Sequence, residues 1–394
     1  MRFAAAFSTR PQLSHAVDEV VGAVTDELDA NIDLAFIFLS ASYINGDSID
    51  QLSDIAARLA DQLGTENIIG CSGESVIANQ YELELPPALS LWVGSIPKLQ
   101  FDSCHLAFHS QHGDSGFAGW TDELTGDWPD NSTVFTFGDP FSFPMDVLLQ
   151  RMNEDRSGTP ILGGMASGCD MPGAACLILG DRVYHHGAVL VRVHGDFVID
   201  PVVSQGCRPI GEPLVITKSE RNEIYQLGGK PALEQLQAIF QTLPQQERLM
   251  VNKGLHVGRV VSEYIEQPKQ GDFLIRNVVQ IDEQSGMIVI GDFVRTGQTM
   301  QFQIRDHESA AAELKHLLSR LAANQQKPEA AVVFNCNGRG TRLFPVEHHD
   351  TQLIRQVLGP IPVSGFFAAG EIGPIGDVNF LHGFTSSMAV FREL

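Results

Sequence analysis

A polar segment that directly follows an apolar stretch carries the side chains best suited to hold a small ligand. Residues 331–335 predict a buried strand, and Asn335-Cys336-Asn337-Gly338-Arg339-Gly340 closes it. Ligand sites in α/β proteins favour such strand ends. Arg339 offers a planar guanidinium to a carboxylate or phosphate, and Asn337 can orient a polar group beside it. The competing interpretation is that Arg339 pairs with an internal carboxylate such as Glu371 and only braces two loops.

Glu371 supplies the opposite charge that an amino-acid ligand would require. A guanidinium binds the α-carboxylate and a carboxylate binds the ammonium group, so Arg339 and Glu371 together match both ends of such a ligand. Glu74 ends the shorter segment Gly70-Cys71-Ser72-Gly73-Glu74 in the same way. The predicted ligand-binding residues are Arg339, Asn337, Cys336, Glu371, Gly370, Glu74, Ser72, Gly73 and His382.

Two cysteines, Cys71 and Cys336, lie just beyond predicted strand ends and beside glycine. A thiol in that position becomes a nucleophile when a basic neighbour lowers its pKa, and His382 or His186 is a candidate base. The more common role of such a cysteine is small, buried packing. Cys336, Cys71 and His382 are therefore only weak catalytic candidates, and an enzymatic function is the less favoured hypothesis.

The histidine pairs His185-His186 and His348-His349 do not predict a metal site. Adjacent side chains on a strand point to opposite faces, and the Cys/His spacing of a metal site is missing from the sequence. The glycine motifs of nucleotide-binding loops are missing as well. We therefore predict neither a metal nor a cofactor.

A glycine-rich motif occurs twice in the chain. Pro160-Ile-Leu-Gly163-Gly-Met-Ala166-Ser-Gly168-Cys-Asp-Met-Pro172 and Pro362-Val-Ser-Gly365-Phe-Phe-Ala368-Ala-Gly370-Glu-Ile-Gly-Pro374 share Pro, Gly, Ala, Gly and Pro at identical spacing. Both copies follow an apolar strand candidate and a short helical stretch. We expect an internal duplication, two related lobes around a pseudo-two-fold axis, and glycine-rich loops that let another group approach the backbone.

The remaining elements predict an α+β (mixed α/β) fold with largely antiparallel or mixed sheets packed against helices. Runs of strands joined by tight turns argue against a doubly wound parallel sheet. A cut near residue 200 gives two domains, residues 1–200 and 201–394. The apolar spacing predicts helices over residues 11–28, 48–63, 232–242 and 307–324, a strand over 34–39, and hairpins that pair 175–179 with 188–193 and 274–281 with 287–293.

Composition limits the classes of partner. The chain has 394 residues, 43% of them apolar, and a formal net charge of −22. Such a negative field disfavours binding to nucleic acid or to anionic membranes, and its simplest role is to keep the surface soluble. The six cysteines lack paired spacing, which is typical of reduced thiols. With no apolar stretch near the length of a membrane span or a signal peptide, we expect a cytoplasmic protein.

Four of these segments resemble the FIST family, whose members carry an N-terminal and a C-terminal FIST domain in tandem. The segments are Gly70-Cys71-Ser72-Gly73-Glu74, Gly229-Lys230-Pro231-Ala232-Leu233, Phe334-Asn-Cys336-Asn-Gly338-Arg339-Gly340 and Gly365-Phe366-Phe367-Ala-Ala-Gly370-Glu371-Ile372-Gly373-Pro374. The first is shorter than the fuller Gly-Cys-Ser/Thr-x-x-Gly-Glu form of the family. The resemblance covers nearly the whole chain and implies a sensory module that recognises small molecules such as amino acids.

The first predicted strand begins at Phe3, which leaves no room for an F-box or another output module before it. We therefore expect any signalling output to act through a separate protein. The leading hypothesis is a sensor that binds a small metabolite between two lobes. The alternatives are a cysteine-dependent enzyme of acyl or thiol chemistry, and a ligand-free adaptor whose acidic surface docks a signalling protein. The sequence does not predict an oligomeric state.

Overall fold

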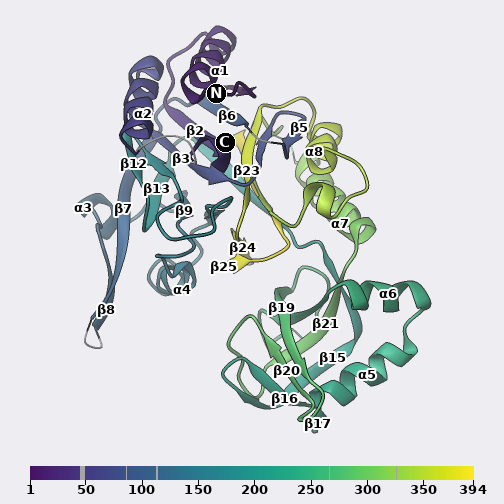
Figure 1. Ribbon diagram of the computed structural model, residues 1–394. Helices are drawn as coiled ribbons and strands as arrows, with labels where there is room; N and C mark the ends of the chain where they lie inside the picture. Colours follow the sequence, from purple (N-terminus) through teal and green to yellow (C-terminus); the bar gives the residue numbers. More distant parts are fainter. Residues whose placement is uncertain (45–48, 86, 112–113, 266, 325) are drawn as a thin grey trace. The chain divides into compact units, whose positions relative to one another are not determined.

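The computed structural model describes residues 1–394 except 45–48, 86, 112–113, 266 and 325 (Figure 1). Its chain forms two compact units. The first unit comprises residues 1–203, 315–381 and 385–394, and the second comprises residues 204–314 and 382–384. The predicted division into domains at residue 200 stays a prediction. The compact units follow a different partition, because strands from the end of the chain pair inside the first unit.

The predicted fold class is confirmed. The described part of the chain is 25% helix and 42% strand, and its four sheets pack with eight α-helices. None of these described helices is long and apolar enough to cross a membrane.

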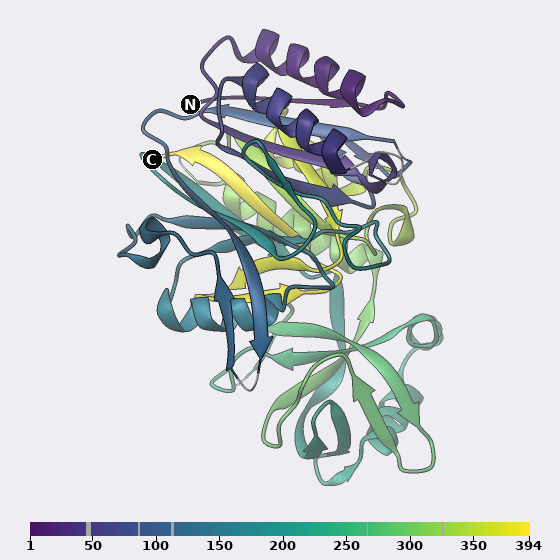
Figure 2. The same cartoon turned by 60° about the vertical axis from the view of Figure 1, so that its left-hand side comes forward.

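The first unit begins with a β-α-β-α-β segment, as the apolar spacing predicts. Strand β2 lies at its centre, parallel to β3 and antiparallel to β6. The buried face of α1 carries Leu13, Val17, Val20 and Val24 at helical spacing. Helices α1 and α2 lie side by side against this sheet (Figures 1 and 2). The elements are β1 (Arg2–Ser8), α1 (Leu13–Leu28), β2 (Leu34–Ser40), α2 (Ile49–Leu63), β3 (Ile68–Gly73), β4 (Val76–Ala78), β5 (Tyr81–Leu83) and β6 (Leu89–Ser95).

The same order of core strands and helices returns twice, so an internal repeat is present as predicted, but in three copies and not as two lobes around a two-fold axis. In the second copy β9 is parallel to β10 and antiparallel to β13. In the third, β22 is parallel to β23 and antiparallel to β26. The second copy contains β7 (Gln100–Gln111), β8 (Asp114–Ala118), α3 (Asp122–Thr125), β9 (Thr133–Gly138), α4 (Met145–Asp155), β10 (Ile161–Met165), β11 (Leu177–Leu179), β12 (Arg182–Tyr184) and β13 (Ala188–His194). The third contains β14 (Phe197–Ser204), α7 (His307–Ala322), β22 (Ala330–Cys336), α8 (His349–Leu358), β23 (Val363–Ala368), β24 (Glu371–Ile375), β25 (Val378–His382) and β26 (Ser386–Glu393).

Each repeat gives its short hairpin to the sheet of another repeat. Hairpin β4–β5 extends β23, β11–β12 extends β3, and β24–β25 extends β10. The exchange closes a cycle among the three repeats. The predicted hairpin that pairs residues 175–179 with 188–193 is therefore wrong. The tight turn at Gly180 closes β11 on β12, whereas the apolar strand β13 lies between β9 and β7.

Glycine has one identical role in all three repeats. Gly70, Gly163 and Gly365 lie on the second strand of each parallel pair, opposite Ile37, Thr136 and Val333. A Cβ at these glycines would come within 1.9, 2.0 and 1.9 Å of the carbonyl oxygen of those partners. The prediction that these glycines form loops is therefore wrong. They lie inside β3, β10 and β23, where only glycine permits such close contact between strands.

Aromatic side chains fill the junction of the three repeats. Phe38, Phe137 and Phe334 occupy equivalent positions. Each directly follows the residue that faces the glycine of the neighbouring parallel strand. Their ring centroids are 5.5 Å (Phe38 to Phe137), 6.4 Å (Phe38 to Phe334) and 5.6 Å (Phe137 to Phe334) apart. The Phe366 ring stacks on Phe38 at 5.1 Å. The centre of the first unit is thus a packed aromatic core.

The second unit is an antiparallel barrel whose sequence is inserted between β14 and α7. It closes because β15 pairs with both β21 and β16. Helix α5 coincides with its predicted range, and the predicted pairing of residues 274–281 with 287–293 is confirmed by β19 and β20. The elements are β15 (Cys207–Glu220), β16 (Glu223–Leu227), β17 (Lys230–Pro231), α5 (Ala232–Thr242), α6 (Gln245–Lys253), β18 (Leu255–Val260), β19 (Phe273–Asp282), β20 (Met287–Ile290) and β21 (Thr299–Arg305).

Candidate functional site

In every repeat the first strand of the parallel pair (β2, β9 or β22) ends at an equivalent position, where the backbone hydrogen bonding is the same and the side chain differs. The residues there are Ser40, Asp139 and Cys336. Their amide groups donate to the carbonyl oxygen of the residue directly before the last strand of each repeat, at 2.8, 2.8 and 2.9 Å, respectively. The framework therefore delivers a hydroxyl, a carboxylate and a thiol to corresponding places.

The loop after β22 turns Arg339 into the interior. Its Nε lies 2.7 Å from Oδ2 of Asp350 and its Nη2 lies 3.0 Å from Oδ1, and both side chains are fully buried. The guanidinium also lies over the ring of Phe344, 5.3 Å from its centroid. Asn335 donates to the same carboxylate at 3.1 Å. Arg339 thus fixes the loop after β22 to the start of α8 through Asp350. The contact is bidentate, as suits a planar guanidinium.

Two buried carboxyl groups meet at the start of α8. Oε1 of Glu82 accepts hydrogen bonds from the amides of Asp350 (2.9 Å) and Thr351 (3.1 Å). Burial and, second, the charge of Asp350 raise the pKa of Glu82, and the two hydrogen bonds and Arg339 lower it, so that the pKa is about 8. For Asp350, burial acts to raise the pKa, but Arg339 and His349 outweigh it and hold the pKa at about 2. The pair therefore carries one proton near neutral pH.

Arg342 points the other way, toward solvent, and pairs with Glu74. Its Nη1 lies 3.1 Å from Oε2 of Glu74, its Nη2 contacts Oε1, and Nη1 also donates to the carbonyl of Asn337 at 2.9 Å. The side chains are 57% (Arg342) and 36% (Glu74) exposed. A cation and an anion are thus held together at the surface, above the loop that Arg339 anchors.

Two further polar groups adjoin this ion pair. The hydroxyl of Ser167 accepts a hydrogen bond from the amide of Glu74 at 2.7 Å and donates to the carbonyl of Phe367. The backbone amide of Asn337 donates to the carbonyl oxygen of Ala368 at 3.0 Å. The side-chain Oδ1 of Asn337 is buried and accepts no hydrogen bond from the described residues. Glu74, Ser167, Asn337 and Arg342 therefore form one connected group, which we call the strand-end site.

The structure brings some of the predicted ligand-binding residues together and separates others. Glu74, Asn337 and Cys336 belong to the strand-end site or adjoin it. Ser72 and Gly73 lie in β3, and the hydroxyl of Ser72 accepts from the amide of Cys176 at 3.2 Å. Glu371 is fully buried at the start of β24 and accepts from the amide of Thr385 at 3.0 Å, and the carbonyl of Gly370 accepts from Met165 at 2.8 Å. His382 is buried, ends β25 and belongs to the second unit.

The two candidate nucleophiles differ in environment. Cys71 is fully buried, and burial raises the pKa of its thiol well above the usual value. A protonated, enclosed thiol does not favour nucleophilic chemistry. Cys336 is half-buried, and its Sγ lies 3.5 Å from the amide nitrogen of Gly338.

Sequence reasoning missed three residues of this region: Arg342, Asp350 and Ser167. Arg342 lies three residues beyond Arg339, and nothing local in the sequence says which of the two faces inward. Asp350 directly follows the histidine pair that was considered only for metal binding. Ser167 lies within the repeated glycine motif, so its place beside the glycines was an available signal.

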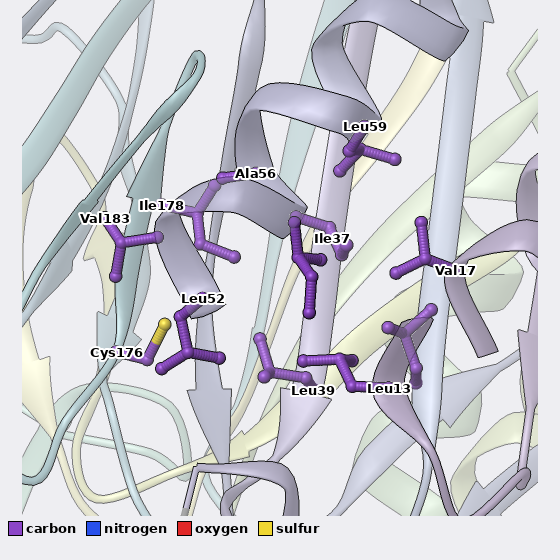
Figure 3. A pocket seen from close by; sticks show the side chains of 12 residues that line it. Leu13, Val17, Ile37, Leu39, Leu52, Ala56, Leu59, Cys176, Ile178 and Val183 are labelled. Carbon is purple, nitrogen blue, oxygen red and sulfur yellow. The ribbon is translucent and has the colours of Figure 1, made fainter. Parts of the chain in front are cut away.

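A pocket elsewhere in the first unit is filled by aliphatic side chains. Leu13 and Val17 of α1, Leu52 and Leu59 of α2, and Ile37 of β2 point toward one another there (Figure 3). Its cavity volume is about 20 Å³, which is room for about one water molecule. This pocket is lined by other residues than those of the strand-end site, and its lining offers almost no polar group to orient a ligand.

The chain belongs to the FIST family. Residues 33–230 match the FIST N domain and residues 232–374 match the FIST C domain. The predicted resemblance to this family is therefore confirmed. The second match begins inside the inserted barrel and continues into the third repeat, where it ends within β24.

The protein is also similar over its full length to mycobacterial proteins that are described as uncharacterised. It is 38% identical over 395 residues to one of Mycobacterium tuberculosis (strain ATCC 25618 / H37Rv), covering 100% of both chains. It is 37% identical to one of Mycobacterium bovis (strain ATCC BAA-935 / AF2122/97), covering 100% of this chain and 99% of the relative. The similarity to these relatives thus spans both FIST domains of the chain.

Proposed function

We propose that this FIST-domain protein is a sensory module that binds a small metabolite carrying both a carboxylate and an ammonium group, such as an amino acid, at the strand-end site. The single observation that carries the proposal is the exposed pair of Glu74 and Arg342, held beside Oδ1 of Asn337, which has no hydrogen-bond partner within the described part of the chain. An amino acid offers its carboxylate to Arg342 and its ammonium group to Glu74 and Asn337. The ligand chemistry is the one that the sequence predicts for Arg339 and Glu371, but here it is assigned to Arg342 and Glu74.

This ion pair costs little free energy to open. Exposed ion pairs contribute about 0–1 kcal/mol to stability, so a zwitterion that inserts between the two groups sacrifices little. Charge-assisted hydrogen bonds with a ligand are each worth about 1.5–3 kcal/mol where water is partly excluded. By contrast, opening the buried pair of Arg339 and Asp350 would leave two charges without partners. Binding would then reposition the 336–342 loop, and a separate signalling protein would read that change.

The test is a thermal-shift and calorimetric screen of the protein against amino acids and related metabolites. We expect at least one to stabilise the wild type, and Arg342→Gln to abolish the response. Arg10→Gln is a matched control, because Arg10 forms a comparable exposed pair with Glu19, with 57% and 42% of the side chains exposed. A broad library without any response, or a response that survives Arg342→Gln, contradicts the proposal.

Cysteine-dependent chemistry is a second candidate with one supporting observation. A thiolate at Cys336 would interact favourably with the charge of Arg342. The rate of alkylation by iodoacetamide as a function of pH measures this directly. A thiol that reacts in wild type near neutral pH, and only at higher pH in Arg342→Gln, supports the enzyme hypothesis, and an unreactive Cys336 removes it. A ligand-free adaptor remains the third prediction. Co-purification of a partner protein without any bound small molecule would favour it.

A further inference from the structure

The second repeat contains a pocket with a different chemistry, between α3 and α4. It has a cavity volume of about 230 Å³. Phe117 of β8 and the tryptophans on either side of α3, Trp120 and Trp128, supply aromatic walls. Helix α4 supplies one face at helical spacing. The residues that line the pocket are Phe117, Trp120, Leu124, Thr125, Trp128, Leu148, Arg151, Met152, Asp155 and Arg156.

Comparison with the first repeat explains why the pocket exists. There α1 has 16 residues, and the pocket that its side chains and those of α2 line has a cavity volume of only about 20 Å³. In the second repeat the corresponding helix, α3, has only 4 residues. The short helix leaves the sheet and α4 incompletely covered, and the two tryptophans line the space without filling it. The pocket is thus a local departure from the shared framework.

The lining carries positive charge in a strongly acidic chain. Arg151 and Arg156 outnumber the single carboxylate of Asp155, although the chain as a whole has a formal net charge of −22. The guanidinium of Arg156 lies 4.8 Å from the centroid of Trp128, and that of Arg151 lies 5.6 Å from the centroid of Phe117. Cations held against aromatic faces beside a cavity are suited to a flat, negatively charged guest.

The two arginines have different tasks. Nη2 of Arg156 donates to the carbonyls of Gly126 (2.7 Å) and Thr125 (3.2 Å), so this side chain holds the end of α3 in place. Arg151 is exposed, and its Nη2 donates to the carbonyl of Ser115 at a longer 3.3 Å. A guanidinium has five N–H donors in a planar fork. Arg151 is therefore the group that can turn toward a ligand carboxylate.

We infer that the α3–α4 pocket binds a small aromatic carboxylate, with its ring between the tryptophans and its carboxylate on Arg151. The volume lies below the usual range of about 300–1,000 Å³ for drug-sized ligands, so the guest has one or two rings. This site shares no residue with the strand-end site, and its occupation is independent of the proposed amino-acid sensing.

The probe is benzoate, titrated into the full-length protein by calorimetry and by tryptophan fluorescence. The chain has 3 tryptophans, and two of them line this pocket, so ring binding changes the emission directly. For a ligand of this size we expect a Kd of roughly millimolar or tighter. Benzamide, with the same ring and no charge, and cyclohexanecarboxylate, with the charge and no aromatic ring, should each bind more weakly.

Variants separate the charge from the cavity. Arg151→Gln should weaken benzoate binding about tenfold or more and leave benzamide binding unchanged. Thr125→Trp, at an exposed lining position, should fill the pocket and abolish both. Arg182→Gln is the control, because Arg182 is an exposed arginine of the same repeat and pairs with Asp181 outside the pocket.

Three outcomes overturn the inference: no binding of benzoate up to millimolar concentrations, equal binding of all three compounds, or benzoate affinity unchanged by Arg151→Gln. Any response to amino acids should persist in Arg151→Gln. Failure at the α3–α4 pocket is thereby distinguishable from failure at the strand-end site.

Discussion

The strand framework of the first unit and the loops at its strand ends obey different constraints. In the framework, Gly70, Gly163 and Gly365 meet a facing carbonyl at 1.9–2.0 Å in the position of a Cβ, so one residue type is required in all three repeats. At the strand ends, Ser40, Asp139 and Cys336 share one backbone hydrogen bond and no side-chain chemistry. Steric necessity therefore preserves the framework, while the loops are free to acquire separate sites.

The first prediction tests the framework and has the largest expected effect. Gly365→Ala places a methyl group against the carbonyl of Val333, which a central strand cannot move aside. We expect the free energy of unfolding to fall by more than about 4 kcal/mol, measured by urea denaturation. Gly22→Ala is the control, because Gly22 lies in α1 with nothing within 4 Å, and alanine there should stabilise by about 1 kcal/mol. A folded Gly365→Ala protein of wild-type stability refutes the steric argument.

The second prediction concerns the buried anchor of the 336–342 loop. Asp350→Ala leaves the Arg339 guanidinium buried without its carboxylate. We expect a loss of about 3–5 kcal/mol in urea denaturation. The double variant Asp350→Ala/Arg339→Leu should recover part of that loss, since it removes the isolated charge. If Asp350→Ala is nearly neutral, the loop does not depend on this pair.

The third prediction is a pH dependence of stability. The pKa of Glu82 is raised to about 8 in the folded protein from its ordinary 4.5, so the folded state binds more protons than the unfolded state between these values. Stability should therefore fall as pH rises from 4.5 to 8, by up to about 1.4 kcal/mol per pH unit. Asp350 acts in a lower window, because its pKa of about 2 makes its contribution disappear as pH falls from 3.8 toward 2.

The variant that isolates the Glu82 contribution is Glu82→Gln. Its amide oxygen can still accept from the backbone of Asp350 and Thr351, but it does not titrate. Thermal unfolding followed from pH 4.5 to 8 should lose the Glu82 component of its slope in this variant. An identical slope in wild type and Glu82→Gln would assign the pH dependence to other groups.

The smallest stability effect is expected at the strand-end site itself. Arg342→Gln breaks an exposed ion pair, so its free energy of unfolding should change by less than about 1 kcal/mol. Asp350→Ala in the same region should cost several times more stability than Arg342→Gln. This difference tests most directly whether buried anchors, and not the exposed ion pair, stabilise the fold. A large destabilisation by Arg342→Gln would make the Glu74 contact structural and weaken its proposed role in ligand binding.

Much of the local structure could be predicted from the sequence. Helices α1 and α5 follow apolar spacing, and the β19–β20 hairpin follows its turn residues. The repeated glycine motif correctly indicated an internal repeat. A third copy stayed hidden because the first repeat shares only part of the motif.

The candidate site was predictable only in part. Glu74, Asn337 and Cys336 were recognised because polar residues after an apolar strand mark a strand end. The inward orientation of Arg339 was not predictable. Arg342 lies only three residues away, and Arg339 turns inward because a carboxylate of α8 pairs with it. Asp350 provides that carboxylate through tertiary packing.

Taken alone, the sequence determined the secondary-structure periodicity, the repeated glycine motif and the family, because each is carried by residue types within short segments of the chain. Tertiary structure decided which sheet each hairpin extends, which arginine is buried and where the aromatic pocket opens. Those outcomes depend on contacts between residues tens to hundreds of positions apart, such as Glu74 with Arg342, which local spacing does not encode.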